Sequence, residues 1–387
     1  MKEKLESISP LPTHQAPNGE GLQIGPEAIF KELGLLDKLL TPLIVLFMII
    51  GVIIGEFAPR IRDAFDTVRF DSVSVPIAVG LVVMMWPILT KVQYERLPKV
   101  FSSSRLWIHL GISFVLNWII GPFMMLALAW ATLPDLPGYR TGVVLVGIAR
   151  CIAMVMIWNQ LARGDGDYCA ILVVFNAILQ IVLFSPFALL FINVIGGQDT
   201  AHVSYRDAAI SVLIYLGIPL VAGVVTRYSV WALTSKEFLN KKFLPFFSPL
   251  ALLGLLYTIL VMFAYQGHHI IHNLRPVFRV FVPLILYFTI MFSCTFALMF
   301  YLSRREATKD RLFGYDLAVV QAFTASSNNF ELAIAVAIAI FGVNSEQALA
   351  ATIGPLVEVP VLLALTWVAL FLKSKLTWRR LDSEPQA

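Results

Sequence analysis

A cluster of polar side chains interrupts the apolar stretch that runs from Ala318 to Phe341. Its members lie near the centre of that stretch: Thr324, Ser326, Ser327, Asn328, Asn329 and Glu331. The stretch is long enough to cross a bilayer, because a spanning helix needs roughly 20 mostly apolar residues. A charged side chain at the bilayer centre costs about 2.5 to 3.5 kcal/mol even on insertion scales, so it persists where it faces a polar cavity. We therefore expect Glu331 to mark a pathway or a binding site.

The same cluster predicts a local loss of helical structure. Asn and Ser disfavour helix interiors because their side chains compete for backbone hydrogen bonds, and irregular backbone at membrane depth is tolerated where protein or a polar cavity surrounds it. We expect an unwound segment inside this span and hence a broken helix. The alternative is an intact helix whose Ser and Asn side chains bond to neighbouring helices.

Arg150 and Cys151 interrupt a second apolar stretch, and they are the next candidates for chemistry. Arg150 either supports a substrate cavity, pairs with Glu331 or Glu358, or has a purely structural role. A cysteine in such a helix is by default a small buried hydrophobe. A neighbouring arginine and the start of a half-helix both favour the thiolate, which binds soft ligands.

Three more polar residues lie in other apolar stretches. Glu358 lies between Pro355 and Pro360, and it either supports Glu331 from a neighbouring position or is a second titrating group. Asn176, followed one turn later by Gln180, occupies the corresponding place after the first interruption. We expect Asn176 to give polar support to the site.

Composition places the chain among polytopic membrane proteins. Of its 387 residues 58% are hydrophobic and only 14% are charged, with a mean hydropathy of +0.79, whereas globular proteins have about 25% charged residues. The net charge of +4 comes from loops, so no nucleic-acid partner is expected. The three cysteines lie apart in apolar stretches, and no nucleotide-binding glycine-lysine loop or zinc motif is present. We expect no disulfide, no metal site, no cofactor and no enzymatic activity.

Ten apolar spans are predicted, which makes the protein all-α with ten transmembrane helices. They cover residues 42–58, 75–92, 106–131, 139–161, 168–195, 208–230, 246–265, 279–302, 317–341 and 347–372. The fourth and fifth spans share their rhythm with the ninth and tenth, which indicates two inverted five-helix repeats with matched broken helices, a pattern typical of secondary transporters. The predicted organisation is a flexible N-terminal tail over 1–36, a transporter domain over 37–374 with repeats at about 37–196 and 205–374, and a C-terminal tail over 375–387.

The distribution of basic residues predicts the orientation. Most Lys and Arg residues fall in the N-terminal tail, the C-terminal tail and the even-numbered connections. Because basic residues concentrate on the cytoplasmic side, we expect both termini in the cytoplasm and a multi-pass protein of the plasma membrane.

Three segments resemble the signature segments of a known family. GIARCIAMVMIWNQLARGD, SSNNFELAIAVAIAIFG and IGPLVEVPVLLAL are similar to those of the arsenical-resistance (Acr-type) arsenite efflux family, in the bile-acid/arsenite/riboflavin transporter superfamily. The resemblance implies crossed breaks in helices four and nine and an exporter of arsenite, and often antimonite, that exchanges it for protons. It places the functional cysteine at Cys151 and the functional carboxylate at Glu331.

The chemistry of arsenite agrees with these residues. Arsenite is a small neutral trihydroxide with a soft centre, so a carrier needs one soft ligand together with amide and hydroxyl groups. We expect Cys151 to be the soft ligand and Ser326, Asn328, Asn329 and Glu331 to complete the substrate site. We expect Glu331 to carry the coupled proton, with Glu358 as a second candidate.

Two other functions stay open. A sodium-coupled carrier of organic anions on the same fold would use the serines and asparagines around Asn328 as sodium ligands and would leave Cys151 incidental. A membrane receptor would need an output domain, for which the short cytoplasmic segments leave no room.

Overall fold

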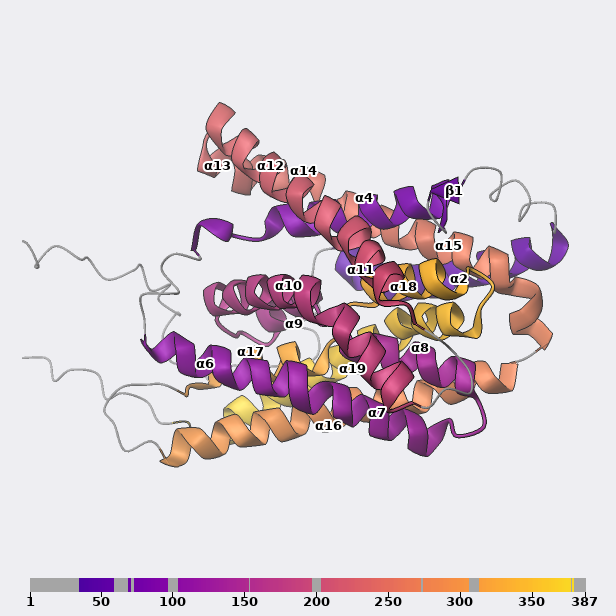
Figure 1. Cartoon of the computed structure of the whole chain (residues 1–387). Coiled ribbons are helices and arrows are strands. Elements are labelled where there is room, and N and C mark those ends of the chain that lie inside the picture. The colour runs from indigo at the N-terminus through magenta and orange to yellow at the C-terminus, as the bar shows by residue number, and fades with distance from the viewer. Residues whose placement is uncertain are drawn as a thin grey trace, which may run out of the picture.

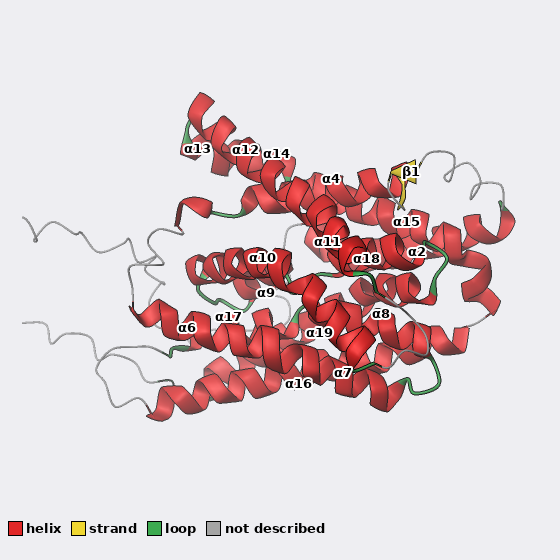
Figure 2. Cartoon of the chain, viewed as in Figure 1, coloured by secondary structure: helices red, strands yellow, loops and turns green. Residues whose placement is uncertain are grey.

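The computed structural model describes residues 35–58, 69–70, 73–96, 104–152, 154–196, 203–272, 274–305, 313–376 and 378. Most of the expected N-terminal tail and most of the expected C-terminal tail lie outside these residues, although residues 35 and 36 of the expected N-terminal tail belong to the first described helix. Helices make up most of the described chain and are joined by short loops (Figures 1 and 2). The described strands are β1 (Arg69–Phe70) and β2 (Val73–Ser74), which pair antiparallel with Arg69 opposite Ser74.

The helical elements follow one another closely in the sequence. In the N-terminal half they are α2 (Leu35–Phe57), α4 (Val75–Lys91), η1 (Tyr94–Arg96), α6 (Ser104–Phe114), η2 (Val115–Ile120), α7 (Gly121–Thr132), α8 (Pro137–Ile148), α9 (Met154–Leu161), α10 (Gly166–Ala188) and η3 (Leu189–Val194). In the C-terminal half they are α11 (Tyr205–Val212), η4 (Leu213–Gly217), α12 (Ile218–Leu233), α13 (Lys236–Phe238), η5 (Leu239–Phe243), α14 (Leu244–Phe247), α15 (Pro249–His272), α16 (Leu274–Arg305), α17 (Tyr315–Ser326), α18 (Phe330–Phe341) and α19 (Glu346–Lys375).

Six helical stretches among the described residues are long and apolar enough to cross a membrane. They are Leu106–Thr132, Gly166–Val194, Tyr205–Leu233, Lys236–Tyr265, Leu274–Arg305 and Glu346–Lys375. Shorter apolar helices cover Pro42–Phe57, Ala78–Lys91 and Phe330–Phe341. The protein is therefore a helical multi-pass membrane protein, while the count of ten spans and the inverted repeat stay predictions.

The helices pack in two groups. Helices α2, α4, α12 and α15 contact one another and form the upper part of the view in Figure 1. Helices α7, α8, α16, α17, α18 and α19 form a second group, and α10 and α9 pack against α17. In the first group α2 lies very close to α15. The approach is so close that a Cβ at Gly51 or Gly55 would overlap the α15 backbone. This small-residue spacing is a common way for membrane helices to approach closely.

Local π-helical turns accompany the prolines of the long spans. The turns at 115–120, 213–217 and 239–243 precede Pro122, Pro219 and Pro245, and the turn at 189–194 follows Pro186. Proline lacks an N–H donor and its ring clashes with the carbonyl four residues earlier, so the hydrogen-bond ladder shifts there. The spans remain helical through these turns.

A buried ion pair joins Arg227 of α12 to Glu95 of η1, next to the end of α4. The Arg227 side chain is fully buried, and its Nη2 and Nε donate to the Glu95 carboxylate at 2.7 and 3.0 Å. Its Nη1 donates to the carbonyl of Thr90 at 3.2 Å, and Lys236 contacts Glu95 at 3.3 Å. Burial acts to raise the pKa of Glu95, but the hydrogen bonds and charge of Arg227 prevail and hold it at about 2.

Removal of the Glu95 charge should reduce the stability of the protein by an amount that depends on pH. Glu95→Gln leaves the buried Arg227 without a counter-charge, which should lower the free energy of unfolding by about 3 kcal/mol at pH 7. The pKa of Glu95 is lower in the folded state than in the unfolded state. The extra free energy of unfolding of the wild type over the variant is therefore full above about pH 4.3 and is lost as the pH falls toward 2. Thermal unfolding of the purified protein at pH 7 and at pH 3 measures this.

The matched control is Glu237→Gln. Glu237 pairs with Lys241 at 2.7 Å, but both side chains are about three-quarters exposed. That substitution should change stability by less than about 0.5 kcal/mol at either pH. An equal effect of the two substitutions at pH 7 would contradict the role assigned to Arg227.

Candidate functional site

Both predicted helix breaks are present. Helix α8 ends at Ile148 and α9 begins at Met154, and Ala149 is extended with φ −84° and ψ 116°. Helix α17 ends at Ser326 and α18 begins at Phe330, and Ser327 is extended with φ −97° and ψ 154°. Two non-helical segments thus lie inside otherwise apolar helical stretches.

The two segments pair with each other. Arg150 and Asn328 form an antiparallel bridge, and the backbone N–H of Asn329 donates to the carbonyl of Ala149 at 3.0 Å. We call residues 149–151 and 327–329 the crossing.

The side chains of Asn328 and Asn329 form hydrogen bonds with free backbone groups at the helix ends of the crossing. The Nδ2 of Asn328 donates to the carbonyls of Val146 and Ala149 at 2.9 and 3.2 Å, which caps the end of α8. The Oδ1 of Asn329 accepts from the N–H of Leu332 at 3.1 Å and caps the start of α18. Ser326 and Ser327 both contact the carbonyl of Phe323. These amides hold freed backbone groups and leave Asn328 Oδ1 and Asn329 Nδ2 without partners.

Side chains alternate between the two faces of the crossing. In an extended segment neighbouring side chains point to opposite faces, and residues directly opposite in a pair share a face. The bridge at Arg150 and Asn328 therefore puts Cys151 opposite Ser327 on the other face. The Ser327 side chain is a hydrogen-bonding neighbour of the Cys151 thiol, in agreement with this register.

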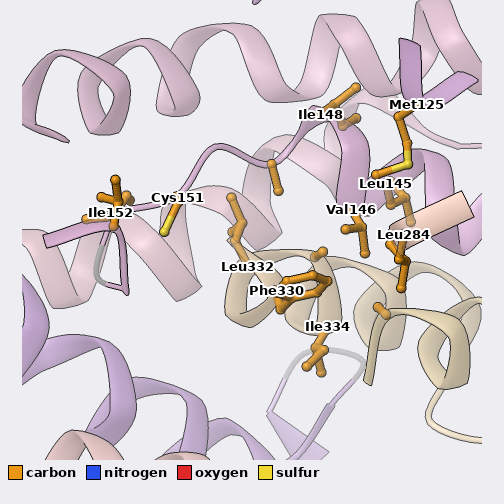
Figure 3. Close-up of a cluster of buried hydrophobic side chains, with 14 of the residues drawn as sticks. Met125, Leu145, Val146, Ile148, Cys151, Ile152, Leu284, Phe330, Leu332 and Ile334 are labelled. Carbon is orange, nitrogen blue, oxygen red and sulfur yellow. The ribbon is translucent and has the colours of Figure 1, made fainter. Parts of the chain in front are cut away.

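The face that carries Cys151 brings three predicted site residues together, and we call it the thiol face. Glu331 and Glu358 both act electrostatically on Cys151 and on each other, and the carboxyl group of Glu358 contacts the backbone N–H of Asn328. Glu331 keeps some accessible surface, whereas Glu358 is 2% exposed and its Oε1 has no hydrogen-bond partner. Figure 3 shows Cys151 leaving the extended segment on the side of α18, in a surround of aliphatic residues such as Leu332. One thiol and two carboxylates thus meet in an otherwise apolar setting.

Of the alternatives open for Arg150, the structure does not show the pairing with Glu331 or Glu358. The Arg150 side chain lies on the opposite face, is fully buried, and donates from Nη1 to the hydroxyl of Tyr287 at 2.8 Å. The Tyr287 hydroxyl in turn donates to the carbonyl of Ala325 at 3.0 Å. The sequence places Arg150 next to Cys151, but the extended backbone turns the two side chains apart. Its charge therefore does not act directly on the thiol.

Asn176 bonds to a tryptophan of η2. Its Oδ1 accepts from the indole N–H of Trp118 at 3.1 Å, which joins α10 to η2. Gln180, one turn later, accepts a hydrogen bond from the backbone N–H of Arg150 and so steadies the crossing. Tyr287 was not predicted as part of this region, because a single tyrosine in an apolar span carries no signal in the sequence.

Cys169 and Cys294 are outside the site. The Cys169 thiol is buried, with the carbonyl of Val155 at 4.0 Å, and Cys294 is exposed on α16. Neither has a neighbouring carboxylate at a crossing. Cys151 is thus the cysteine that the fold places among the predicted site residues.

Loss of the Asn328 amide should weaken the crossing. Asn328→Asp keeps the side-chain shape but replaces the two N–H donors with an acceptor that faces two carbonyls. We expect a loss of about 2 to 3 kcal/mol in the free energy of unfolding, because the carbonyls at the end of α8 lose their partners. Thermal unfolding of the purified variant measures the loss. The control is Asn240→Asp in the exposed η5 turn, and equal unfolding midpoints for the two variants would show that Asn328 does not cap α8.

Known proteins resemble this chain over most of its length. Residues 78–273 match the model of the Sodium Bile acid symporter family. The Arsenical-resistance protein Acr3 of Corynebacterium glutamicum is 40% identical over 346 residues, which cover 88% of this chain and 90% of that protein. The Arsenical-resistance protein Acr3 of Alkaliphilus metalliredigens is 29% identical, over 88% of this chain and 93% of that protein. An uncharacterized transporter of Synechocystis is 31% identical, over 89% of this chain and 91% of that protein.

The family match includes the first half of the crossing, and the three relatives each cover 88 or 89% of the chain, which includes both halves of it. These similarities agree with a helical membrane protein whose polar residues meet inside apolar spans. The chain therefore belongs to the Sodium Bile acid symporter family and, within it, to the Acr3-type arsenical-resistance proteins, which are membrane transporters and not enzymes.

Proposed function

We propose that this protein is a secondary transporter that exports arsenite, and antimonite as well, from the cytoplasm in exchange for protons. The observation that carries the proposal is the thiol face, where Cys151 lies opposite Ser327 and interacts with Glu331 and Glu358. The names of the two Acr3 relatives support an arsenical substrate. Arsenic(III) is thiophilic, so a single thiol in an apolar surround distinguishes it from harder oxygen compounds.

Binding of arsenite to the Cys151 thiol does not by itself couple transport to protons. The thiol exchanges with one hydroxyl of arsenite, so an S–As bond forms, an As–O bond breaks, and the thiol proton leaves with the hydroxide as water. This exchange leaves the net charge of the site unchanged, and it neither releases nor takes up a free proton. Proton coupling therefore needs a separate group, and the two carboxylates that interact with the thiol can supply it.

We assign the coupled proton to Glu331, with Glu358 as its partner. Glu331 keeps some accessible surface, whereas Glu358 is buried, so Glu331 is the better placed of the two to exchange a proton. Glu358 is buried against the backbone of Asn328, where its charge state depends on that of Glu331. Alternate occupation of the site by a proton on Glu331 and by arsenite on Cys151 gives exchange of the two.

The proposal includes the topology predicted from the sequence. Ten spans form two inverted repeats over about 37–196 and 205–374, with both termini in the cytoplasm and the protein in the plasma membrane. The helical stretches of the described residues overlap each of the ten predicted ranges, which supports this count. The two breaks, in α8–α9 and α17–α18, fall at corresponding places in the two halves.

The test is arsenite uptake into inverted membrane vesicles with an imposed gradient. We expect uptake when the vesicle interior is acidic, collapse of uptake when a protonophore is added, and no effect of replacing sodium by potassium. Antimonite should compete with arsenite. Uptake that persists without a proton gradient, or that needs sodium, would contradict proton exchange.

A second candidate is a sodium-coupled carrier of organic anions, which the matched family model favours by its name. Ser327 and Asn329 at the crossing offer oxygen ligands for sodium. The same vesicles, given taurocholate and a sodium gradient, distinguish the two. Sodium-driven taurocholate uptake without arsenite uptake would select this alternative.

A further inference from the structure

The crossing has a second face that the proposed function does not use. Arg150 and Asn328, which are directly opposite in the bridge, share this face and point away from Cys151. We call it the guanidinium face. Tyr287 of α16 borders it through its hydrogen bond from Arg150. Gly121 of α7 borders it too, because a Cβ there would lie 2.7 Å from Nη1 of Arg150.

Arg150 is a buried cation without a counter-charge in the described part of the chain. Its side chain is 0% exposed, Nη1 bonds to the neutral Tyr287 hydroxyl, and Nε and Nη2 have no hydrogen-bond partner. A guanidinium does not lose its proton in proteins, so the charge cannot be removed by titration. Arg227 is equally buried, but it binds a carboxylate with two nitrogens and a backbone carbonyl with the third.

The free donors of Arg150 and the free acceptor of Asn328, residues that are opposite each other in the bridge, indicate the kind of ligand that fits this face. Nε–H and Nη2–H of a guanidinium point in parallel and match two oxygens of one oxyanion. Asn328 Oδ1, on the same face, is buried and has no donor, so it can accept a hydrogen bond from a hydroxyl group. A water molecule would fill the hydrogen bonds but would leave the charge unbalanced.

We propose that the guanidinium face binds a small monovalent oxyanion that keeps one hydroxyl group, such as hydrogencarbonate. The two bare oxygens accept from Nε and Nη2 of Arg150, and the hydroxyl donates to Asn328 Oδ1. The bound anion balances the guanidinium charge at the crossing. This site is separate from the thiol face and does not depend on which substrate Cys151 binds.

Thermal unfolding of the full-length protein in lipid nanodiscs tests the site. Chloride is replaced stepwise by hydrogencarbonate or by formate at constant pH and ionic strength. We expect hydrogencarbonate to raise the unfolding midpoint by about 3 °C at saturation, because a ligand that binds only the folded state stabilises it. Formate, which lacks the hydroxyl, should need a concentration about ten times higher.

Two substitutions and one control identify the residues. Arg150→Met removes the charge and should abolish the hydrogencarbonate shift. Arg150→Lys keeps the charge but lacks the parallel donors, so the half-saturating concentration should rise at least about tenfold. The control is Arg279→Met on α16, the helix that carries Tyr287. Arg279 binds Asp135 with two hydrogen bonds of 2.6 Å at the helix end, so this variant should keep the full shift.

An absent or non-saturable hydrogencarbonate shift in the wild-type protein would overturn the proposal, even if neither Arg150 variant can be purified. A shift that survives Arg150→Met, or one that Arg279→Met also removes, would overturn the assignment to Arg150. Equal half-saturation by formate and hydrogencarbonate would overturn the role of Asn328 as an acceptor from a hydroxyl.

Discussion

Cys151→Ser should lower the initial rate of arsenite transport by at least about 100-fold, because the substitution replaces the single soft ligand of the thiol face with a hard oxygen. Serine is slightly smaller and can still bond to Ser327, so the crossing should keep its structure. The measurement is arsenic accumulated by inverted vesicles over the first seconds, quantified by mass spectrometry. The unfolding midpoint of the purified variant should stay close to that of the wild type.

The other two cysteines provide matched controls for this prediction. Cys169→Ser changes an equally buried thiol that lies outside the crossing, and Cys294→Ser changes an exposed one. Both variants should transport arsenite within about twofold of the wild type. If Cys151→Ser also transports within twofold of the wild-type rate, the thiol is not the arsenite ligand.

Glu331→Gln should remove the response of transport to a pH gradient. The substitution mimics a permanently protonated carboxyl group, so the variant cannot alternate between a proton-bound and a proton-free state. Among the described residues, the titratable groups that interact with Glu331 are Cys151 and Glu358, while Arg150 lies on the opposite face of the crossing. Arsenite flux is measured across a series of external pH values at constant internal pH, where the wild-type rate should change at least about tenfold.

Two further variants separate Glu331 from Glu358. Glu331→Asp keeps a titrating group and should keep part of the pH response. Glu358→Gln removes a buried carboxylate that lacks accessible surface, and we expect a slower rate with the pH response intact. If arsenite flux in Glu331→Gln still depends on the pH gradient, Glu331 does not carry the coupled proton. If the pH dependence is lost only in Glu358→Gln, Glu358 carries it instead.

The helical stretches and their interruptions follow from the sequence. Runs of apolar residues specify helices in a membrane because no other local structure satisfies the backbone there. Asn328 and Asn329 signal the break of α17–α18, since short polar side chains compete for the backbone of a helix interior. The observed helix ends at Ser326 and Phe330 agree with this reasoning.

The sequence also identified the residues of the thiol face but not how they meet. Cys151, Glu331 and Glu358 stand out because polar and reactive groups are rare in apolar spans. Their distances along the chain are large, and only the pairing of two extended segments brings them to one face. Proximity of this kind depends on tertiary contacts that no local pattern encodes.

Arg150 shows what only the tertiary structure could decide. Adjacent positions in the sequence suggested that its charge acts on Cys151 and on the carboxylates. The segment is extended at that point, and in extended backbone adjacent side chains point to opposite faces. The sequence by itself determined which residue types lie in the membrane and where its helices break. The register of the crossing, at Arg150 and Asn328, decided which of those residues face each other, because one step along an extended chain reverses the direction of a side chain.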